Sequence, residues 1–224
     1  MTERFTGFSK SGLTFLTELA ATQNREWFEA NRATYERELR LPMQALVAAL
    51  AFPFQVHDIE LACDPKRALF RIHRDIRFSK NKDPYKTHVG ASMTKSGERL
   101  APGLLYIHID PKGSFLAGGA YMPEPKMLLR LRRRIADRDE MFLQMVEDLN
   151  AVGLTLDRDA SAKRTPGGFE DVENPELIDF IKLKSFTVQR PLDEPTIADC
   201  DKLIDAIVLF ARQIHPMLKF IWAA

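Results

Sequence analysis

The sequence lacks most of the features that identify a protein class at sight. It has only two cysteines among its 224 residues, Cys63 and Cys200, and neither belongs to a CxxC or Cys/His cluster. This predicts two reduced thiols and argues against a zinc site or a redox pair. No GxxxxGK[ST], GxGxxG or GxSxG segment occurs, so we expect neither a nucleotide phosphate loop nor the nucleophile elbow of a hydrolase.

Long apolar runs are also missing. None approaches the roughly 18 residues that a membrane helix needs, and the first residues, MTERFTGFSK, lack the apolar core of a secretory signal. We therefore expect a cytosolic protein with no membrane partner. With 45% hydrophobic residues the chain can bury a substantial core, which favours one domain over residues 1–224.

The spacing of the apolar residues predicts an α+β fold. Ser9 and Asn24 are good N-caps for two N-terminal helices, and Pro42 predicts that the second is kinked or split in two. Helices are expected over residues 10–21, 24–50, 141–149, 177–181 and 195–222, and a further helix is expected to begin at about residue 126. Strands are expected over residues 70–78, 89–94, 104–109, 114–122 and 185–189. We therefore expect an antiparallel β-meander over about residues 70–122, flanked by N-terminal and C-terminal helices.

Residues 104–122 have the pattern of a β-hairpin. Apolar and polar side chains alternate along Leu105, Tyr106, Ile107, His108 and Ile109. Residues 110–113 then place Asp first, Pro second and Gly fourth, which is typical of a type I turn. The glycine pair 118–119 interrupts the returning strand, and either close packing of a helix or an exposed backbone for a ligand would explain it.

Positive charge is concentrated between Lys66 and His88. This segment has a local balance of +6, whereas the whole chain carries only +1. Its cations are Lys66, Arg67, Arg71, Arg74, Arg77, Lys80, Lys82 and Lys86, and its anions are Asp75 and Asp83. Because the remainder of the chain is net negative, the segment indicates an anion site and not a general solubilising surface.

The same segment resembles the signature RxxRDxRFxx[DN]KxxY of the DUF2461 family, bacterial proteins of unknown function. The matching residues are Arg71, Arg74, Asp75, Arg77, Phe78, Asn81, Lys82 and Tyr85. The strand around His108 and the segments FLAGGAYMPEP, RTPGGF and LKSFTVQRPL are similar to the same family, so the resemblance covers nearly the full length. It implies membership without a mechanism, because the family has no established activity.

Arg74 is informative if residues 70–78 form a strand. It would share one face with Phe70, Ile72, Ile76 and Phe78. A guanidinium buried on such a face needs a carboxylate from the protein or an anion from outside. The spacing of Leu69, Ile72 and Ile76 is also compatible with a helix, and this alternative stays open.

We expect seven residues to converge on one anion-binding surface: Arg71, Arg74, Arg77, Lys82, Tyr85, Lys86 and His88. Arginine forks and lysines would bind a phosphate or carboxylate, with a hydrogen bond from Tyr85 or His88. Two alternatives remain. One is a nucleic-acid-binding or processing protein, although a pI of 7.8 is low for a broad nucleic-acid surface. The other is a structural or interaction protein whose basic cluster is an internal ion-pair network.

The five histidines predict neither a metal site nor a cofactor. Their spacings include no HxH, HExxH or HxxxH pair, and the surrounding positive charge would repel a cation. No pattern selects a reaction, so the sequence names no catalytic residue and leaves open whether the protein is an enzyme. It does not determine the oligomeric state either.

Overall fold

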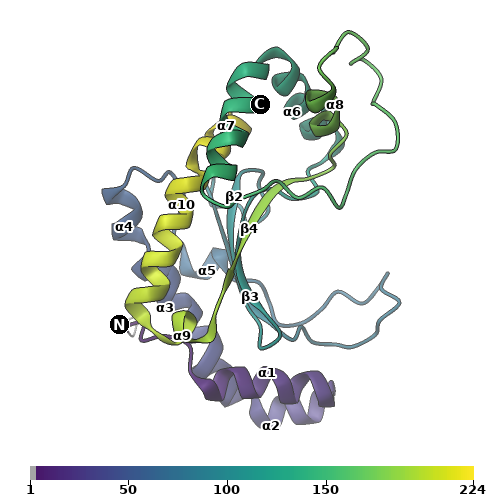
Figure 1. Ribbon diagram of the computed structural model, residues 1–224. Coiled ribbons are helices and arrows are strands. Elements are labelled where there is room, and N and C mark those ends of the chain that lie inside the picture. The colour runs from purple at the N-terminus through teal and green to yellow at the C-terminus, as the bar shows by residue number, and fades with distance from the viewer. Residues whose placement is uncertain (1–3) are drawn as a thin grey trace.

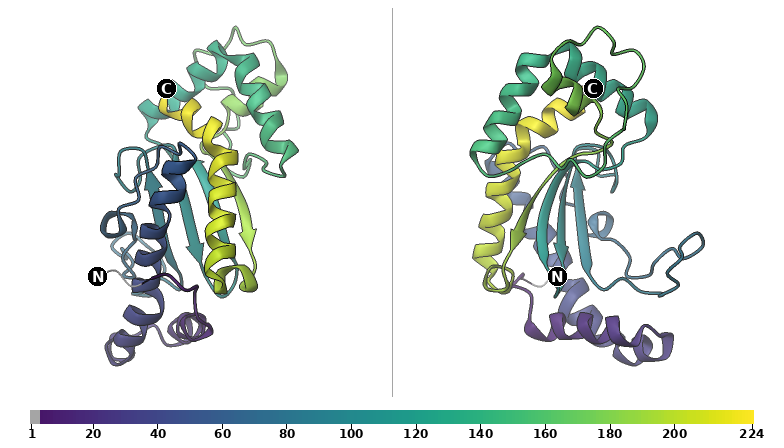
Figure 2. Two further views of the ribbon diagram at one scale, coloured as in Figure 1. Left: turned by 90° about the vertical axis from the view of Figure 1, so that its left-hand side faces the viewer. Right: turned by 45° about the vertical axis from the view of Figure 1, so that its right-hand side comes forward.

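The computed structural model describes residues 4–224 as a central sheet with helices on one face and at both ends (Figures 1 and 2). The helices are α1 (Lys10–Thr22), α2 (Arg25–Tyr35), the π-helical η1 (Glu36–Arg40), α3 (Leu41–Ala49), α4 (Ala51–Val56), α5 (Pro65–Ala68), α6 (Pro125–Asp137), α7 (Asp139–Ala151), α8 (Pro175–Ile181), α9 (Glu194–Ala198) and α10 (Cys200–Trp222). The strands are β1 (Val89–Thr94), β2 (Leu104–Ile109), β3 (Ser114–Ala120) and β4 (Phe186–Leu192), paired in that order. The predicted α+β fold with an antiparallel meander is therefore confirmed.

The register of the sheet places one set of side chains in the core. Ile107 of β2 lies opposite Ala91 of β1 and Leu116 of β3, and all three are fully buried. This face is covered by α10, which contacts β3, and by α3, which contacts β1 (Figure 2). Helix α10 packs closely on β3 at Gly118, because the Ile214 side chain fills the position that a Cβ would need. Close packing of a helix therefore explains why residue 118 is a glycine.

Residues Arg25–Val56 form one helical run of 32 residues. The π-helical segment η1 lies directly before Pro42, whose ring cannot donate a hydrogen bond to the preceding turn. The irregularity predicted at Pro42 is therefore a widened π turn and not a break in the helix.

The same run corrects one expectation from the sequence. Within residues 4–224 it is the one helix long and apolar enough to cross a membrane, with a mean hydropathy of 1.3 over 18 residues. Its length and composition are weak support for a membrane span, because core helices share them, and Leu39, Met43 and Leu46 are fully buried here. The cytosolic location stays a prediction.

The strand predicted over residues 70–78 is wrong, and β4 is the fourth strand instead. Residues 70–86, here called the arm, leave the sheet after the bridge between Leu69 and Ala91 and project as an irregular extended hairpin (Figure 1). Its two sides are joined by bonds such as Lys86 N–H to the Ile72 carbonyl, at 2.8 Å. Pro84 offers no N–H, and the sheet order within residues 4–224 places no strand beside the arm, so a regular ladder does not form.

Arg74 is consequently not buried on an apolar face. Its side chain is 29% exposed, and its Nη1 lies 3.9 Å from Oδ2 of Asp83, which is 49% exposed. Phe78, expected on the same buried face, is 96% exposed. The helix alternative is wrong as well, because α5 ends at Ala68. The apolar alternation of the arm is buried near its base, where Ile72 is 6% exposed, and not at Phe78.

Candidate functional site

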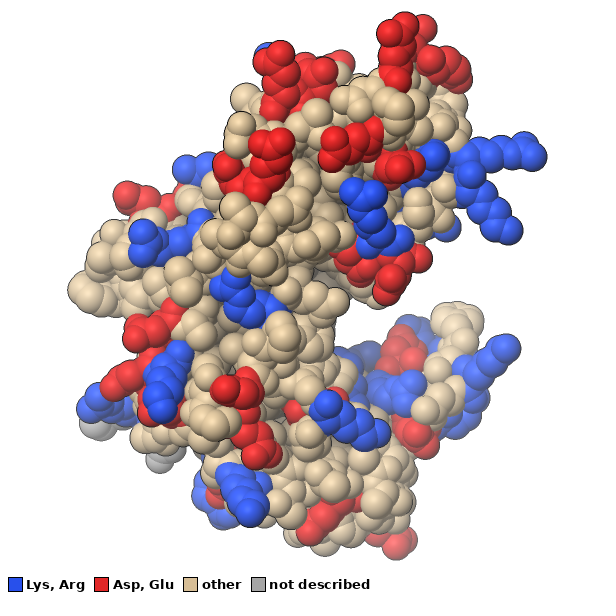
Figure 3. Space-filling view, viewed as in Figure 1, with Lys and Arg blue, Asp and Glu red and all other residues tan. Residues whose placement is uncertain are grey.

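The face of the sheet opposite α10 carries a cavity of about 470 Å³, here called the sheet cavity. Its apolar lining residues include Phe70, Leu100, Leu104, Phe115, Ala117 and Val188, and its polar lining residues are Lys86, His88, Ser92, Tyr106, His108, Asp157, Thr187 and Gln189. The space-filling view shows the surface hollowed between the arm and the helices above it, with charged groups of both signs around the hollow (Figure 3). Apolar walls with a few convergent polar groups are typical of a small-molecule site.

Strand β2 supplies the centre of this cavity. Tyr106 and His108 point to the same face because they are two residues apart, and Asp110 follows two residues later. The Tyr106 hydroxyl lies 3.0 Å from Nδ1 of His108, and His108 Nε2 lies 3.6 Å from Oδ2 of Asp110. Gly90 of β1 makes room for this row, since a Cβ there would lie 2.6 Å from the Tyr106 hydroxyl oxygen.

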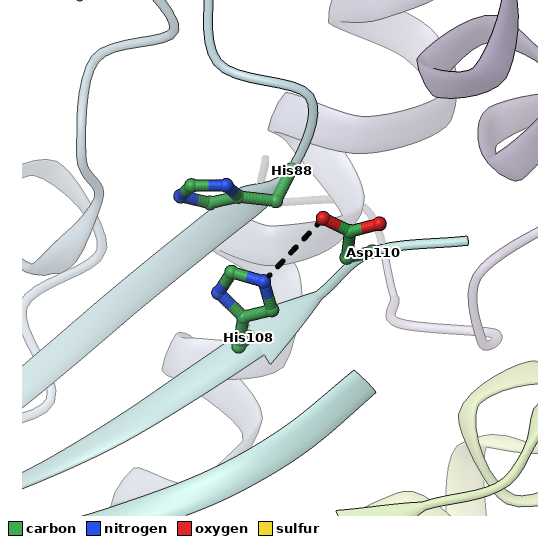
Figure 4. Close-up of side chains that lie close together, drawn as sticks. All are labelled: His88, His108 and Asp110. Atoms are coloured by element: carbon green, nitrogen blue, oxygen red, sulfur yellow. Dashed lines mark ion pairs between the residues drawn. The ribbon is translucent and has the colours of Figure 1, made fainter. Parts of the chain in front are cut away.

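His88 joins the row from the neighbouring strand. It directly precedes β1, and its ring centroid lies 4.2 Å from that of His108. His88, His108 and Asp110 each offer a nitrogen or oxygen ligand atom within 4.8 Å of the others (Figure 4). The spacing rules for histidine pairs could not find this group, because the antiparallel pairing of β1 with β2 brings its members together.

Burial controls the protonation of these side chains. Burial, followed by the neighbouring His108 and Lys86, lowers the pKa of His88 to about 4. Burial also lowers the pKa of His108, although Asp110 opposes this effect. The pKa of Tyr106 is raised to about 12, first by burial and then by Asp110. At neutral pH the cavity floor therefore presents two neutral imidazoles and a protonated phenol.

Two cations lie over the Phe70 ring at the edge of the sheet cavity, and a third, Arg71, is close enough to Lys86 to lower its pKa. Lys86 Nζ lies 5.0 Å and Arg99 Cζ 5.3 Å from the centroid of the Phe70 ring. Burial lowers the pKa of Lys86, and the positive charges of Arg71 and Arg99 lower it further. Within residues 4–224 none of these three cations forms an ion pair with a carboxylate.

The structure does not bring all seven predicted residues together. Lys86 and His88 line the sheet cavity, and Arg71 is close enough to Lys86 to affect its pKa. Arg77 instead pairs with Asp75, at 2.7 Å, and Lys82 donates to the Ile76 carbonyl at 2.9 Å. Arg74 lies beside Asp83. These three cations have their partners inside the arm.

Tyr85 faces the core and not the cavity. Its ring is 3% exposed and stacks on Phe28 of α2, with the centroids 4.4 Å apart. Gln23, the C-cap of α1, holds the Tyr85 backbone by accepting from its N–H at 3.1 Å and donating to its carbonyl at 3.3 Å. Tyr85 therefore fixes the base of the arm to the N-terminal helices.

Tyr106, His108, Asp110 and Arg99 were not among the residues predicted from the sequence to form the site. One signal was available, since alternation along β2 already placed Tyr106 and His108 together on the face away from the apolar residues. Nothing local marked Arg99, because its approach to Phe70 depends on how the chain folds back after β1.

Comparison with known proteins gave one match. A family model described as a conserved hypothetical protein (DUF2461) matches residues 11–220. No curated protein and no solved structure matches the chain.

Proposed function

Because the chain belongs to the DUF2461 family, whose description names no activity, we propose a function from the geometry of the sheet cavity. The protein binds a small anionic ligand there, one that bears a phosphate or a carboxylate. The cavity volume suits a small molecule and not a macromolecule.

The observation that supports this proposal is a group of cations near Phe70 that form no ion pair with a carboxylate. Lys86, Arg71 and Arg99 are held close to one another, and the pKa of Lys86 is lowered first by burial and then by the positive charges of Arg71 and Arg99. A structural network would place a carboxylate among them, whereas an anion site leaves the position for the ligand. An external anion therefore completes the charge balance.

The rest of the cavity suits the remainder of such a ligand. Tyr106 offers a hydroxyl group and His88 a neutral imidazole, while Phe70 and Phe115 provide apolar walls. A few fixed polar groups give orientation, and the apolar walls bury the carbon skeleton. Of the residues predicted from the sequence, Arg71, Lys86 and His88 belong to this proposal.

The test compares Lys86→Met with Lys82→Met, which removes an equal charge from the arm at a position bonded to a backbone carbonyl. Thermal melting is followed in inorganic phosphate, a nucleoside monophosphate and a dicarboxylate, on metal-free protein. An anion at about 100 times its Kd adds about 2.7 kcal/mol of stability, which corresponds to about 5–11 °C for a chain of this size. Wild type and Lys82→Met should gain this shift, and Lys86→Met should not.

Without added anion, Lys86→Met should melt at or slightly above the wild-type temperature, because it relieves repulsion from Arg71 and Arg99. A wild type that responds to none of the three probes refutes the proposal. Equal responses of the two lysine variants refute the assignment to the sheet cavity.

Nucleic-acid binding is a second candidate, and one observation favours it. Phe78 on the arm is 96% exposed, and Arg77 Cζ lies 5.8 Å from its ring centroid. An exposed aromatic ring beside cations is a stacking platform for single-stranded bases. Fluorescence anisotropy with a labelled single-stranded oligonucleotide tests this: Phe78→Ala should weaken binding, and Phe52→Ala, at another exposed phenylalanine on α4, should not. Equal binding by both variants excludes the arm.

A further inference from the structure

We propose that His88, His108 and Asp110 bind a divalent transition-metal ion at the floor of the sheet cavity. One ligand atom from each lies within 4.8 Å of the others, and His108 Nε2 lies 3.6 Å from Oδ2 of Asp110 (Figure 4). Metal bonds to these atoms are about 2.0–2.2 Å long, so donors on one ion lie about 3–4 Å apart. Small side-chain rotations therefore bring the three atoms to bonding distance. This departs from the expectation of no metal site, which rested on histidine spacing along the chain and on repulsion by the surrounding positive charge.

The hydrogen bonds made by His108 and Asp110 leave His108 Nε2 and Asp110 Oδ2 available to an ion. The Tyr106 hydroxyl, 3.0 Å from Nδ1 of His108, fixes the ring with Nε2 toward Asp110. Oδ1 of Asp110 accepts from Lys112 N–H at 2.8 Å, so Oδ2 remains for the ion. A histidine that binds a metal usually forms a hydrogen bond through its second ring nitrogen, and the group at the other end of that hydrogen bond sets the orientation of the ring. Tyr106 is thus a positioning residue.

The ligand set indicates the kind of ion. Two imidazoles and one carboxylate suit zinc or iron(II), and three protein ligands leave at least one coordination position open. His88 and His108 both line the sheet cavity, so an open position faces a ligand bound there. A closed structural metal site would need a fourth protein ligand.

The positive charge nearby determines what completes the coordination. Asp110 supplies one negative charge, and Lys86 lines the same cavity as His88, so an ion at this site leaves a surplus of positive charge. An anionic group bound jointly by the ion and Lys86 would neutralise it. This coupling rests on the proposed function above, whereas the metal site itself does not.

The experiment uses untagged, metal-free full-length protein. Zinc binding is measured by titration calorimetry, and cobalt(II) is added separately because its visible absorption reports a low-coordinate site with nitrogen ligands. Wild type should bind one equivalent of zinc and give the cobalt bands. His88→Gln and Asp110→Asn should lose both signals, and Tyr106→Phe should bind about 10–100-fold more weakly.

His57→Gln, at an exposed histidine at the end of α4, is the matched control and should bind as wild type does. Circular dichroism shows whether each variant is folded, and the wild-type cobalt spectrum tests the proposal without any variant. A wild type that binds neither metal overturns the proposal, as does equal binding by wild type, His88→Gln and Asp110→Asn. Because the anion test uses metal-free protein, failure of one proposal leaves the other standing.

Discussion

Replacing Tyr85 by alanine should lower the free energy of unfolding by about 3–5 kcal/mol, the usual cost of removing a buried aromatic ring. The residue is 3% exposed, and its ring centroid lies 4.4 Å from that of Phe28 and 5.2 Å from that of His73. Removing the ring would therefore leave a buried cavity where these contacts are now made. For a chain of this size, that loss corresponds to about 6–20 °C in melting temperature. Tyr85→Phe keeps the stacked ring and should stay within about 1 kcal/mol of wild type.

Urea unfolding followed by circular dichroism measures both variants, and amide hydrogen exchange across residues 70–88 shows whether the arm has detached. If Tyr85 were a ligand residue and not an anchor, Tyr85→Phe would lose anion binding while Tyr85→Ala would remain stable. A Tyr85→Ala variant that unfolds at the wild-type urea concentration, with the arm still protected, would refute the packing argument.

Three further predictions use other parts of the fold. Gly118→Ala should cost about 1–3 kcal/mol because its methyl group meets Ile214 Cδ1, and adding Ile214→Val, which removes that atom, should restore most of the loss in urea unfolding. Arg74→Met should change stability by less than about 1 kcal/mol in thermal melting, because its exposed ion pair contributes little. Burial raises the Cys63 pKa to about 12, so iodoacetamide should modify Cys63 more slowly than Cys200 at pH 8, as measured by mass spectrometry.

Each of these has a clear contrary result. Additive losses in Gly118→Ala and Ile214→Val would mean that the two side chains do not meet. A loss of several kcal/mol in Arg74→Met would restore the buried-partner interpretation. Equal alkylation of both cysteines in the native protein would place Cys63 at the surface, and the urea-unfolded chain serves as the control in which equal rates are expected.

Local signals determined much of the fold. The caps Ser9 and Asn24 begin α1 and α2 as predicted, because their side chains accept from nearby backbone N–H groups within one turn. The turn at residues 110–113 follows from Asp, Pro and Gly at fixed positions, with Gly113 N–H bonded to the Asp110 carbonyl at 3.1 Å. Such features depend on neighbours in the chain, so the sequence alone is sufficient.

Only the tertiary structure determined the conformation of residues 70–78 and the location of the site. Alternation predicts a strand only if a partner strand exists, and within residues 4–224 the sheet places no strand beside the arm, although Tyr85 at its base packs on α2. The charge cluster likewise divides between internal pairs in the arm and the cations around Phe70, according to which acids the fold brings near. His88 and His108 meet because β1 and β2 pair antiparallel in one register. Contacts between residues distant in sequence depend on how the elements pack, and no local pattern encodes them.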